Sequence, residues 1–240
     1  MICILHHLGL GDQLMINGLV NHYSQKDDVY IVAKRVHQDT LTFMYRDNKR
    51  VNFIWVDNTN PREIWRIVKP FGAQVLPLAT YAVDDALWKF MTHTGSPGAN
   101  FTNWACGVYM QAGVHPLVMY TKFGLRRNAT REDALFNKLG LVDKGYIFVH
   151  DSGSGECKKI DVGKDGTLVV RPDMSVTNVF DYLTIIARAK EIHCINSSFA
   201  WMIELCLLGN PKTNFLHVNN AHTYYDSKAV ATAFHNFTIV

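Results

Sequence analysis

The sequence predicts an α/β protein built from two Rossmann-like domains, each with a parallel β-sheet. Short apolar runs alternate with segments of helical pattern along the whole chain. Two of these runs, residues 2–5 and 146–150, lead directly into glycine-containing turns, as the first strand of such a domain does. Ligands of parallel sheets bind at the carboxyl ends of the strands, so we expect the two domains to face one another across a ligand-binding cleft.

The composition is that of a globular protein. A chain of 240 residues with 48% hydrophobic residues is long enough for two domains of ordinary size. Its formal charge of +3 is compatible with an anionic small ligand but too weak to indicate a nucleic-acid partner. The five cysteines are scattered without metal-ligand spacing, and no apolar stretch is long enough for a transmembrane segment. We therefore expect a cytoplasmic protein with reduced thiols.

The first domain is expected to span residues 1–103. Its last twelve residues are rich in glycine, proline and small polar residues, which is typical of a long loop. The expected strands are 2–5, 28–33, 51–56 and 74–78, and the expected helices are 14–23, 36–45 and 62–68.

The second domain is expected to span residues 104–240. Helices are predicted at 104–112, 130–139, 179–189 and 198–208, and strands at 146–150, 168–171, 191–195 and 213–218. This alternation is again that of a parallel sheet with helices on its faces.

The first glycine turn carries an acidic residue. Gly9 and Gly11 allow a tight turn into a helix that begins near Asp12. Such a turn aims backbone N–H groups and the positive end of a helix at one point, which suits a phosphate or a developing negative charge. Asp12 is either a helix cap or a general base, and both readings stay open. His7 could share the work of a base because histidine titrates near neutral pH.

The second glycine turn is followed by basic residues. Lys158, Lys159 and Arg171 come after strands of the second domain, where they could stabilise a departing diphosphate without a metal ion. The alternative is that all three are solvated surface charges. The turn itself includes Ser152 and Gly153.

Polar residues also open the apolar helix predicted at 198–208. The run from Asn196 to Ser198 could bind phosphate oxygens or serve as an ordinary N-cap. Glu204 interrupts the apolar helix, where its carboxylate could accept hydrogen bonds from ribose or could face solvent. His150, at the end of a predicted strand, is a further candidate.

A nicotinamide-dependent dehydrogenase is one alternative, because Gly9-x-Gly11 follows a strand. Leu14 stands where the dinucleotide fingerprint has its third glycine, and the second strand ends in a basic pair in place of an acidic residue. The basic pair, Lys34-Arg35, could tolerate a 2′-phosphate, so an NADP-dependent oxidoreductase stays open as the enzymatic alternative.

Three segments resemble motifs of metal-independent, two-domain GT-B glycosyltransferases. Gly9-Leu-Gly-Asp-Gln-Leu14 resembles the Gly-x-Gly-Asp-x-Leu opening of bacterial heptosyltransferases, in which the aspartate is regarded as the general base. The segment from Val149 to Lys159 is similar to their strand, glycine turn and following lysine, which faces the donor diphosphate. Asn196-Ser-Ser-Phe-Ala-Trp201 resembles both their Asp-Thr-Gly-x-x-His-Leu helix start and the Asn-Ser-Ser-Phe-Ser-Trp motif of fucosyltransferases.

The resemblance implies a trimmed GT-B fold and an enzyme that transfers a hexose or deoxyhexose from a nucleotide diphosphate sugar to a carbohydrate acceptor. It implies inversion and no cofactor or metal, with Asp12 and His7 as the catalytic candidates. A non-catalytic sugar- or nucleotide-binding module is the alternative from another class. The residues expected to bind the donor are Gly9, Gly11, Gln13, His150, Ser152, Gly153, Lys158, Lys159, Arg171, Asn196, Ser197, Ser198, Phe199 and Glu204.

Two departures limit what the resemblance carries. Trp201 stands where the heptosyltransferase helix has histidine, and Ser152 stands where the fucosyltransferase His-x-Arg signature has arginine. We therefore do not expect this protein to share the donor specificity of either family.

Overall fold

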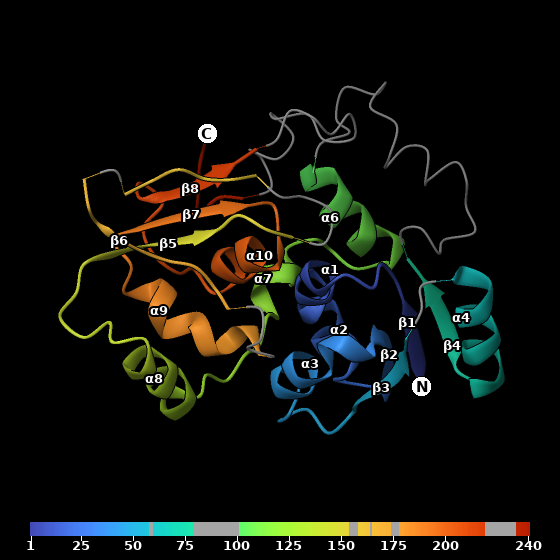
Figure 1. Cartoon of the computed structure of the whole chain (residues 1–240). Helices are drawn as coiled ribbons and strands as arrows, with labels where there is room; N and C mark the ends of the chain where they lie inside the picture. The colour runs from blue at the N-terminus through green and yellow to red at the C-terminus, as the bar shows by residue number, and fades with distance from the viewer. Residues whose placement is uncertain (58–59, 79–100, 154–157, 164, 174–177, 219–233) are drawn as a thin grey trace. The chain divides into compact units, whose positions relative to one another are not determined.

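The computed structural model describes residues 1–240 except 58–59, 79–100, 154–157, 164, 174–177 and 219–233 (Figure 1). The chain forms two compact units, Met1–Leu125 and Arg126–Val240. Each unit contains one β-sheet, and all the strand pairs described in both sheets are parallel. The predicted α/β class with two parallel sheets is confirmed, whereas the cleft between the domains stays a prediction.

The first sheet has the strand order β3-β2-β1-β4. The chain adds β2 and β3 on one side of β1 and then β4 on the other, so it reverses its direction of winding at β1. All four residues of β1 are buried, as expected for a central strand of a parallel sheet. Its strands are β1 (Ile2–Leu5), β2 (Val29–Lys34), β3 (Val51–Val56) and β4 (Gln74–Pro77). The described helices of this unit are α1 (Leu10–Met15), α2 (Asn17–Tyr23), the 3₁₀-helix η1 (Arg35–His37), α3 (Gln38–Met44), α4 (Pro61–Val68), the 3₁₀-helix η2 (Lys69–Phe71), α6 (Phe101–Gln111) and α7 (Val118–Thr121).

A tyrosine hydroxyl divides the helix predicted at 14–23 into α1 and α2. The hydroxyl of Tyr109 accepts a hydrogen bond from Leu19 N at 3.1 Å and donates one to Met15 O at 2.9 Å. It takes the place of the helical bond that would join these two backbone groups, and an inserted side chain of this kind is a recognised cause of helix breaks. Tyr109 is fully buried, so this contact fixes α6 onto the start of α2.

The two compact units divide between residues 125 and 126, whereas the sequence predicted domains that divide between residues 103 and 104. Besides Tyr109, the next helix and the chain after it also pack on α2. A Cβ atom at Gly18 would lie 2.3 Å from the backbone oxygen of Val118, so only glycine allows α2 and α7 to approach this closely. The side chain of Asn17 then binds both backbone groups of Gly124, accepting from its N–H at 2.8 Å and donating to its oxygen at 3.3 Å.

The second sheet has the order β6-β5-β7-β8-β9 and reverses its winding at β5. On one face of β5, Phe148 packs against the rings of Tyr182 and Phe199. On the other face, Ile147 and Val149 belong to a separate apolar cluster. The described elements of the second unit are α8 (Ala129–Lys138), β5 (Tyr146–His150), β6 (Leu168–Val170), η4 (Val179–Tyr182), α9 (Leu183–Ala187), β7 (Glu191–Ile195), α10 (Ser198–Leu205), β8 (Asn214–His217) and β9 (Thr238–Ile239).

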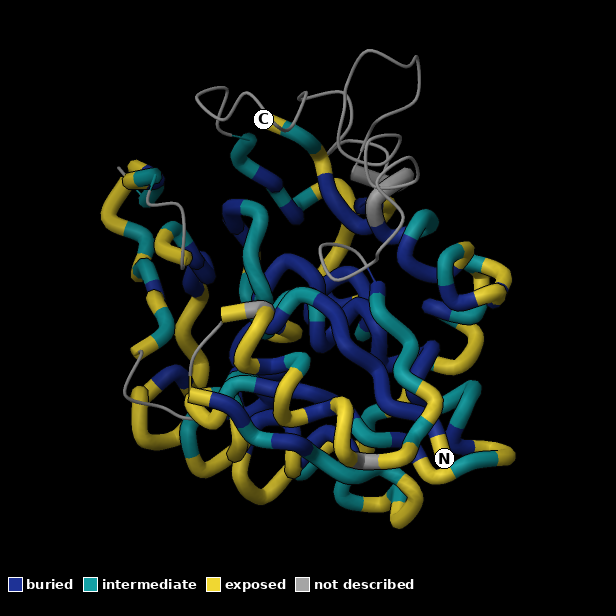
Figure 2. The backbone as a smooth tube through the Cα atoms, turned by 90° about the vertical axis from the view of Figure 1, so that its right-hand side faces the viewer, coloured by how far each residue is buried: buried dark blue, intermediate teal, exposed yellow. Residues whose placement is uncertain are grey.

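Burial along the backbone follows these elements. Figure 2 shows buried segments in dark blue and exposed segments in yellow; β1 and β5 are buried over their whole length. Strands that are buried on both faces are what the continuous apolar runs of the sequence predict.

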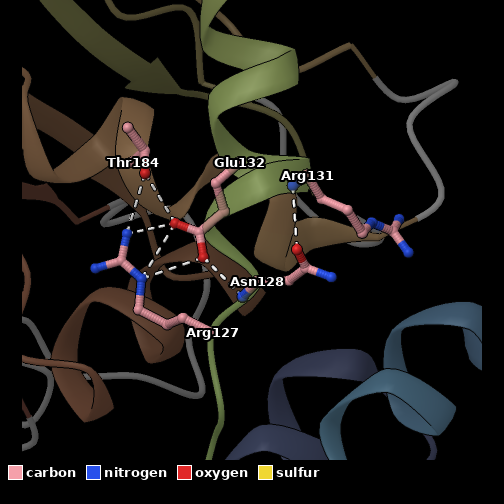
Figure 3. A network of polar contacts seen from close by, with 5 residues as sticks. All are labelled: Arg127, Asn128, Arg131, Glu132 and Thr184. Carbon is pink, nitrogen blue, oxygen red and sulfur yellow. Dashed lines mark hydrogen bonds and ion pairs between the residues drawn. The ribbon is translucent and has the colours of Figure 1, made fainter.

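A buried carboxylate fixes α8 onto α9 (Figure 3). Glu132 is 1% exposed, and its oxygens accept hydrogen bonds from Arg127, from the Thr184 hydroxyl at 2.9 Å and from Asn128 N at 3.2 Å. Asn128 caps the same helix by accepting from Arg131 N. A buried carboxylate is tolerated only when it is paired and hydrogen-bonded in this way, so the network is structural.

Candidate functional site

The carboxyl end of β1 places Asp12 beside Gly9. Gly9 caps α1 with an extended backbone (φ −69°, ψ 147°), and Asp12 lies in the first turn of that helix. A Cβ atom built on Gly9 would lie 2.7 Å from Oδ2 of Asp12, so the glycine leaves room for the carboxylate to fold back over the turn. Gly11 and the half-buried Asp12 and His7 thus lie together where the first sheet reverses its winding. Their predicted roles, general base and donor contact, stay predictions.

Gln13 has a structural contact that its sequence position did not indicate. Its side chain is fully buried, and Nε2 donates to the Val32 oxygen of β2 at 3.1 Å. This bond ties α1 to the sheet. Gln13 thus lies in the interior of the first unit, and its role as a donor contact stays a prediction.

His6, next to this turn, is buried and neutral. The pKa of His6 is lowered to about 3, chiefly by burial and also by His7, while the side chain of Gln13 acts in the opposite direction. Neither ring nitrogen of His6 has a hydrogen-bond partner within the described residues. His6 directly follows β1 and has the buried position of a structural histidine.

His150, Ser197 and Phe199 meet at the carboxyl ends of β5 and β7, where the second sheet reverses its winding. Nδ1 of His150 lies 2.9 Å from Oγ of Ser197, and the rings of His150 and Phe199 are 4.4 Å apart. Three residues that the sequence predicted separately are therefore brought together. This reversal point is where open parallel sheets bind their ligands.

The hydroxyl of Ser197 contacts both the start of α10 and the ring of His150. Ser197 caps α10, and its hydroxyl oxygen accepts from Ala200 N. In the tautomer in which this hydroxyl donates to Nδ1 of His150, the ring proton lies on Nε2. Burial lowers the pKa of His150 to about 4, although Asp151 acts in the opposite direction. At neutral pH the ring is an uncharged N–H donor.

The turn after β5 is held by an ion pair that sequence reasoning missed. Oδ2 of Asp151 lies 3.3 Å from Nε of Arg171, and it also accepts from Ile160 N. Arg171 donates to the Ile160 oxygen at 2.9 Å as well. Arg171 is thus bound to the turn. An acidic residue directly after the strand, with an arginine after the neighbouring strand, was the signal for this pair.

The two lysines differ in their surroundings. Nζ of Lys158 donates to the backbone oxygen of Val218, just after β8, at 3.1 Å, whereas Lys159 is exposed. Ser152 and Gly153 are exposed in the preceding turn, and Asn196 and Ser198 are half-buried at the start of α10. The structure thus gathers Lys158 and the start of α10 at the carboxyl edge of one sheet.

Glu204 neither faces solvent nor has unoccupied carboxylate oxygens. It is 1% exposed, and its two oxygens accept from His235 N at 3.1 Å and Asn236 N at 2.9 Å. These bonds fix the backbone that leads into β9, and Asn236 in turn donates to the Leu208 oxygen. Both oxygens thus have partners within the protein, and Glu204 anchors the chain before β9; its predicted contact with ribose stays a prediction.

Among the described residues, no group of three or more histidine, cysteine or acidic side chains is arranged to hold a metal ion. The same residues include no helix with the length and apolar character to cross a bilayer. Cys3, Cys106, Cys194 and Cys206 are free thiols, and Cys157 lies outside the described residues.

No family model and no curated protein matches the sequence. Two solved structures nevertheless share the fold over the whole chain. The crystal structure of the glycosyl transferase family 9 from Veillonella parvula DSM 2008 has a TM-score of 0.60 at 10% identity, and the match covers 100% of this chain and 86% of that one. The E. coli ADP-heptose LPS heptosyltransferase II has a TM-score of 0.51 at 11% identity, with 100% and 89% covered. The fold of this chain is therefore that of these GT-B-type glycosyltransferases.

Proposed function

We propose that the protein is a glycosyltransferase that moves a hexose or deoxyhexose from a nucleotide diphosphate sugar to a carbohydrate acceptor, with inversion and without a metal ion. It needs no cofactor, because the nucleotide sugar is a substrate. The reduced cysteines suit action in the cytoplasm.

One observation carries this proposal: in each unit, polar side chains gather where the sheet reverses its winding. The first sheet has Asp12 and His7 there, and the second has His150, Ser197 and the nearby Lys158. The glycosyltransferases that share the fold support reading these groups as an acceptor side and a donor side. Titratable side chains at such a sheet edge are what acid–base chemistry on a bound ligand requires.

The proposed chemistry is a single displacement. Asp12 takes the proton of the acceptor hydroxyl as that oxygen attacks the anomeric carbon, and the bond to the diphosphate breaks on the opposite side, which inverts the configuration. A carboxylate at a helix start is a weak base, so His7 is the second candidate for this step. The leaving diphosphate is stabilised by Lys158, Lys159 and the N–H groups at the start of α10.

The test combines binding with transfer. We expect one of UDP, GDP, ADP or dTDP to raise the melting temperature, because a ligand at 100 times its Kd adds about 2.7 kcal/mol of stability. Transfer from the corresponding nucleotide sugar is then measured in EDTA, where it should persist. Asp12→Asn keeps a side-chain oxygen for the helix start but removes the base, so transfer should fall by about 10²–10⁴-fold at unchanged donor affinity.

Four results would contradict the proposal. Loss of transfer in EDTA with recovery in Mn²⁺ would show a metal-dependent enzyme. Near-normal turnover of the Asp12→Asn variant would make Asp12 a cap only. Nucleotide binding without transfer or donor hydrolysis would point to a non-catalytic binding module, and a response to NADP alone would favour the oxidoreductase.

A further inference from the structure

Two histidines and a glutamate form a hydrogen-bonded chain on one face of the second sheet. Oε2 of Glu191 lies 3.2 Å from Nε2 of His193, and Nδ1 of His193 lies 2.9 Å from Nε2 of His217. Glu191 and His193 are two residues apart on β7 and so share a face, while His217 ends the neighbouring strand β8. His193 stacks on Phe215 at 4.8 Å, which holds its ring in this orientation.

The carboxylate sets the direction of every bond in this chain. The Glu191 carboxylate, 46% exposed, can only accept, so Nε2 of His193 donates. In neutral His193 the other nitrogen, Nδ1, then accepts, and the proton of this second bond belongs to Nε2 of His217. Nδ1 of His217 is therefore the nitrogen without a proton.

Lys158 shares the carboxyl end of β8 with His217. Its ammonium group donates to Val218, the residue after His217. Burial, His193 and Lys158 all lower the pKa of His217, which falls to about 4. The strand on the other edge of β8 is β9, Thr238–Ile239, which brings no titratable side chain. An added positive charge is thus disfavoured on His217, whereas a charge on His193 would lie beside the Glu191 carboxylate.

The chain can therefore take up a proton at one end and place the charge at the other. A solvent proton binds Nδ1 of His217, and the proton on Nε2 of His217 crosses to Nδ1 of His193. His193 is then the cation next to Glu191, and His217 is again neutral but now carries its proton on Nδ1. Nδ1 of His217 changes from an acceptor to a donor, while no second cation forms at the end of β8 that His217 shares with Lys158.

We propose that Glu191, His193 and His217 form a proton relay that serves a diphosphate-binding corner at Lys158, so that a bound diphosphate draws one proton onto the relay. A phosphate oxygen can only accept, so it favours the form in which Nδ1 of His217 donates. The inference rests on the proposed function, since the diphosphate is that of the nucleotide-sugar donor, and it adds His217 as a residue that positions the donor.

The experiment uses inorganic pyrophosphate and the full-length chain. Calorimetric titrations in buffers of different ionisation enthalpy, between about pH 5 and about pH 7 where histidines titrate, give the number of protons taken up on binding. We expect the Glu191→Gln variant to take up fewer protons than the unaltered protein, by as much as about one per pyrophosphate. Pyrophosphate's own protonation is common to both proteins, so the difference belongs to the relay.

Asp143→Asn is the matched control. It also removes one exposed carboxylate from the second unit, and its positive φ of 56° is one that asparagine adopts readily. Its proton uptake should equal that of the unaltered protein. A second readout follows the ring nitrogens by NMR on histidine labelled with ¹⁵N, in which saturation with pyrophosphate should move the proton of His217 from Nε2 to Nδ1.

Each outcome decides between the two proposals. Absence of pyrophosphate and nucleoside diphosphate binding would overturn both the proposed function and the relay. Tight binding with the same proton uptake in the unaltered protein and Glu191→Gln would overturn the relay alone, as would a His217 proton that stays on Nε2 in the saturated complex.

Discussion

Replacing Gly9 by alanine is expected to make the protein more stable and the enzyme slower. The backbone of Gly9 (φ −69°, ψ 147°) is one that alanine adopts without strain. The substitution should therefore raise the free energy of unfolding by about 0.4–1 kcal/mol, because alanine restricts the unfolded chain. A loss of activity in this variant could not then be ascribed to unfolding.

The size of the catalytic effect follows from the geometry of Asp12. The new Cβ would lie 2.7 Å from Oδ2 of Asp12, whereas ordinary contact begins at 3.4 Å, so the carboxylate has to move by about 0.7 Å. A misplacement of about 1 Å can cost a catalytic group about 10²-fold. We expect kcat to fall by roughly 10- to 100-fold, or about 1.4–2.7 kcal/mol, with little change in donor affinity.

Gly145→Ala is the matched control for this variant. A Cβ there would displace the end of the flexible Lys190 side chain, 2.2 Å away, just before the amino end of β5. Steady-state transfer assays and thermal unfolding on both variants separate the two effects. A Gly9→Ala enzyme with unchanged kcat would refute the reasoning, because the carboxylate would then have moved without consequence for the chemistry.

Three further predictions test other parts of the molecule. Replacing both Lys158 and Lys159 by alanine should weaken the binding of a nucleoside diphosphate more than that of the nucleoside in titration calorimetry. If the variant binds the nucleoside diphosphate as tightly as the unaltered protein does, neither lysine contacts the diphosphate. Because the folded state lowers the pKa of His6 to about 3 and of His150 to about 4, their contribution to stability is present above about pH 6.5 and is lost as the pH falls. In urea unfolding, the free energy of unfolding should rise with pH by up to about 1.4 kcal/mol per pH unit for each histidine. The His150→Gln variant should lack the contribution of one histidine to this slope. Glu204→Gln places an amide donor against a backbone N–H and should lower the free energy of unfolding by about 1–3 kcal/mol; unchanged stability would contradict the anchoring role.

The strands could be predicted from the sequence because both faces of each sheet are covered. Buried parallel strands read as short apolar runs, and the predicted strands at 51–56, 146–150 and 191–195 match β3, β5 and β7 at both ends. The break between α1 and α2 could not be predicted, because Tyr109 causes it from ninety residues away. Long-range contacts of Tyr109, Val118 and Gly124 with the first helices likewise place these residues in the first unit.

Site residues were predictable to the extent that local position determines them. His150 ends β5 and Ser197 follows the neighbouring strand β7, so their meeting is expected from the strand pairing. Glu204 was not predictable, because its partners are backbone groups 31 and 32 residues later in the chain. Part of the hydrogen-bonded chain through His193 could be expected from the sequence, since Glu191 and His193 are two residues apart on one strand and so share a face. Its continuation to His217 depends on how the strands pair.

The contacts within the second unit change which groups can stabilise a departing diphosphate. Arg171, one of the three predicted cations, already neutralises Asp151 and donates to the Ile160 oxygen. Moving it to a ligand would leave the half-buried Asp151 carboxylate without its ion pair, which is costly. Lys158 and Lys159 therefore supply the positive charge for the proposed reaction, and neutral polar groups such as the His150 ring supply the remaining hydrogen bonds. A site with few unpaired cations depends on how accurately its donors are oriented, and here the Ser197 bond and the Phe199 ring hold the His150 ring in place.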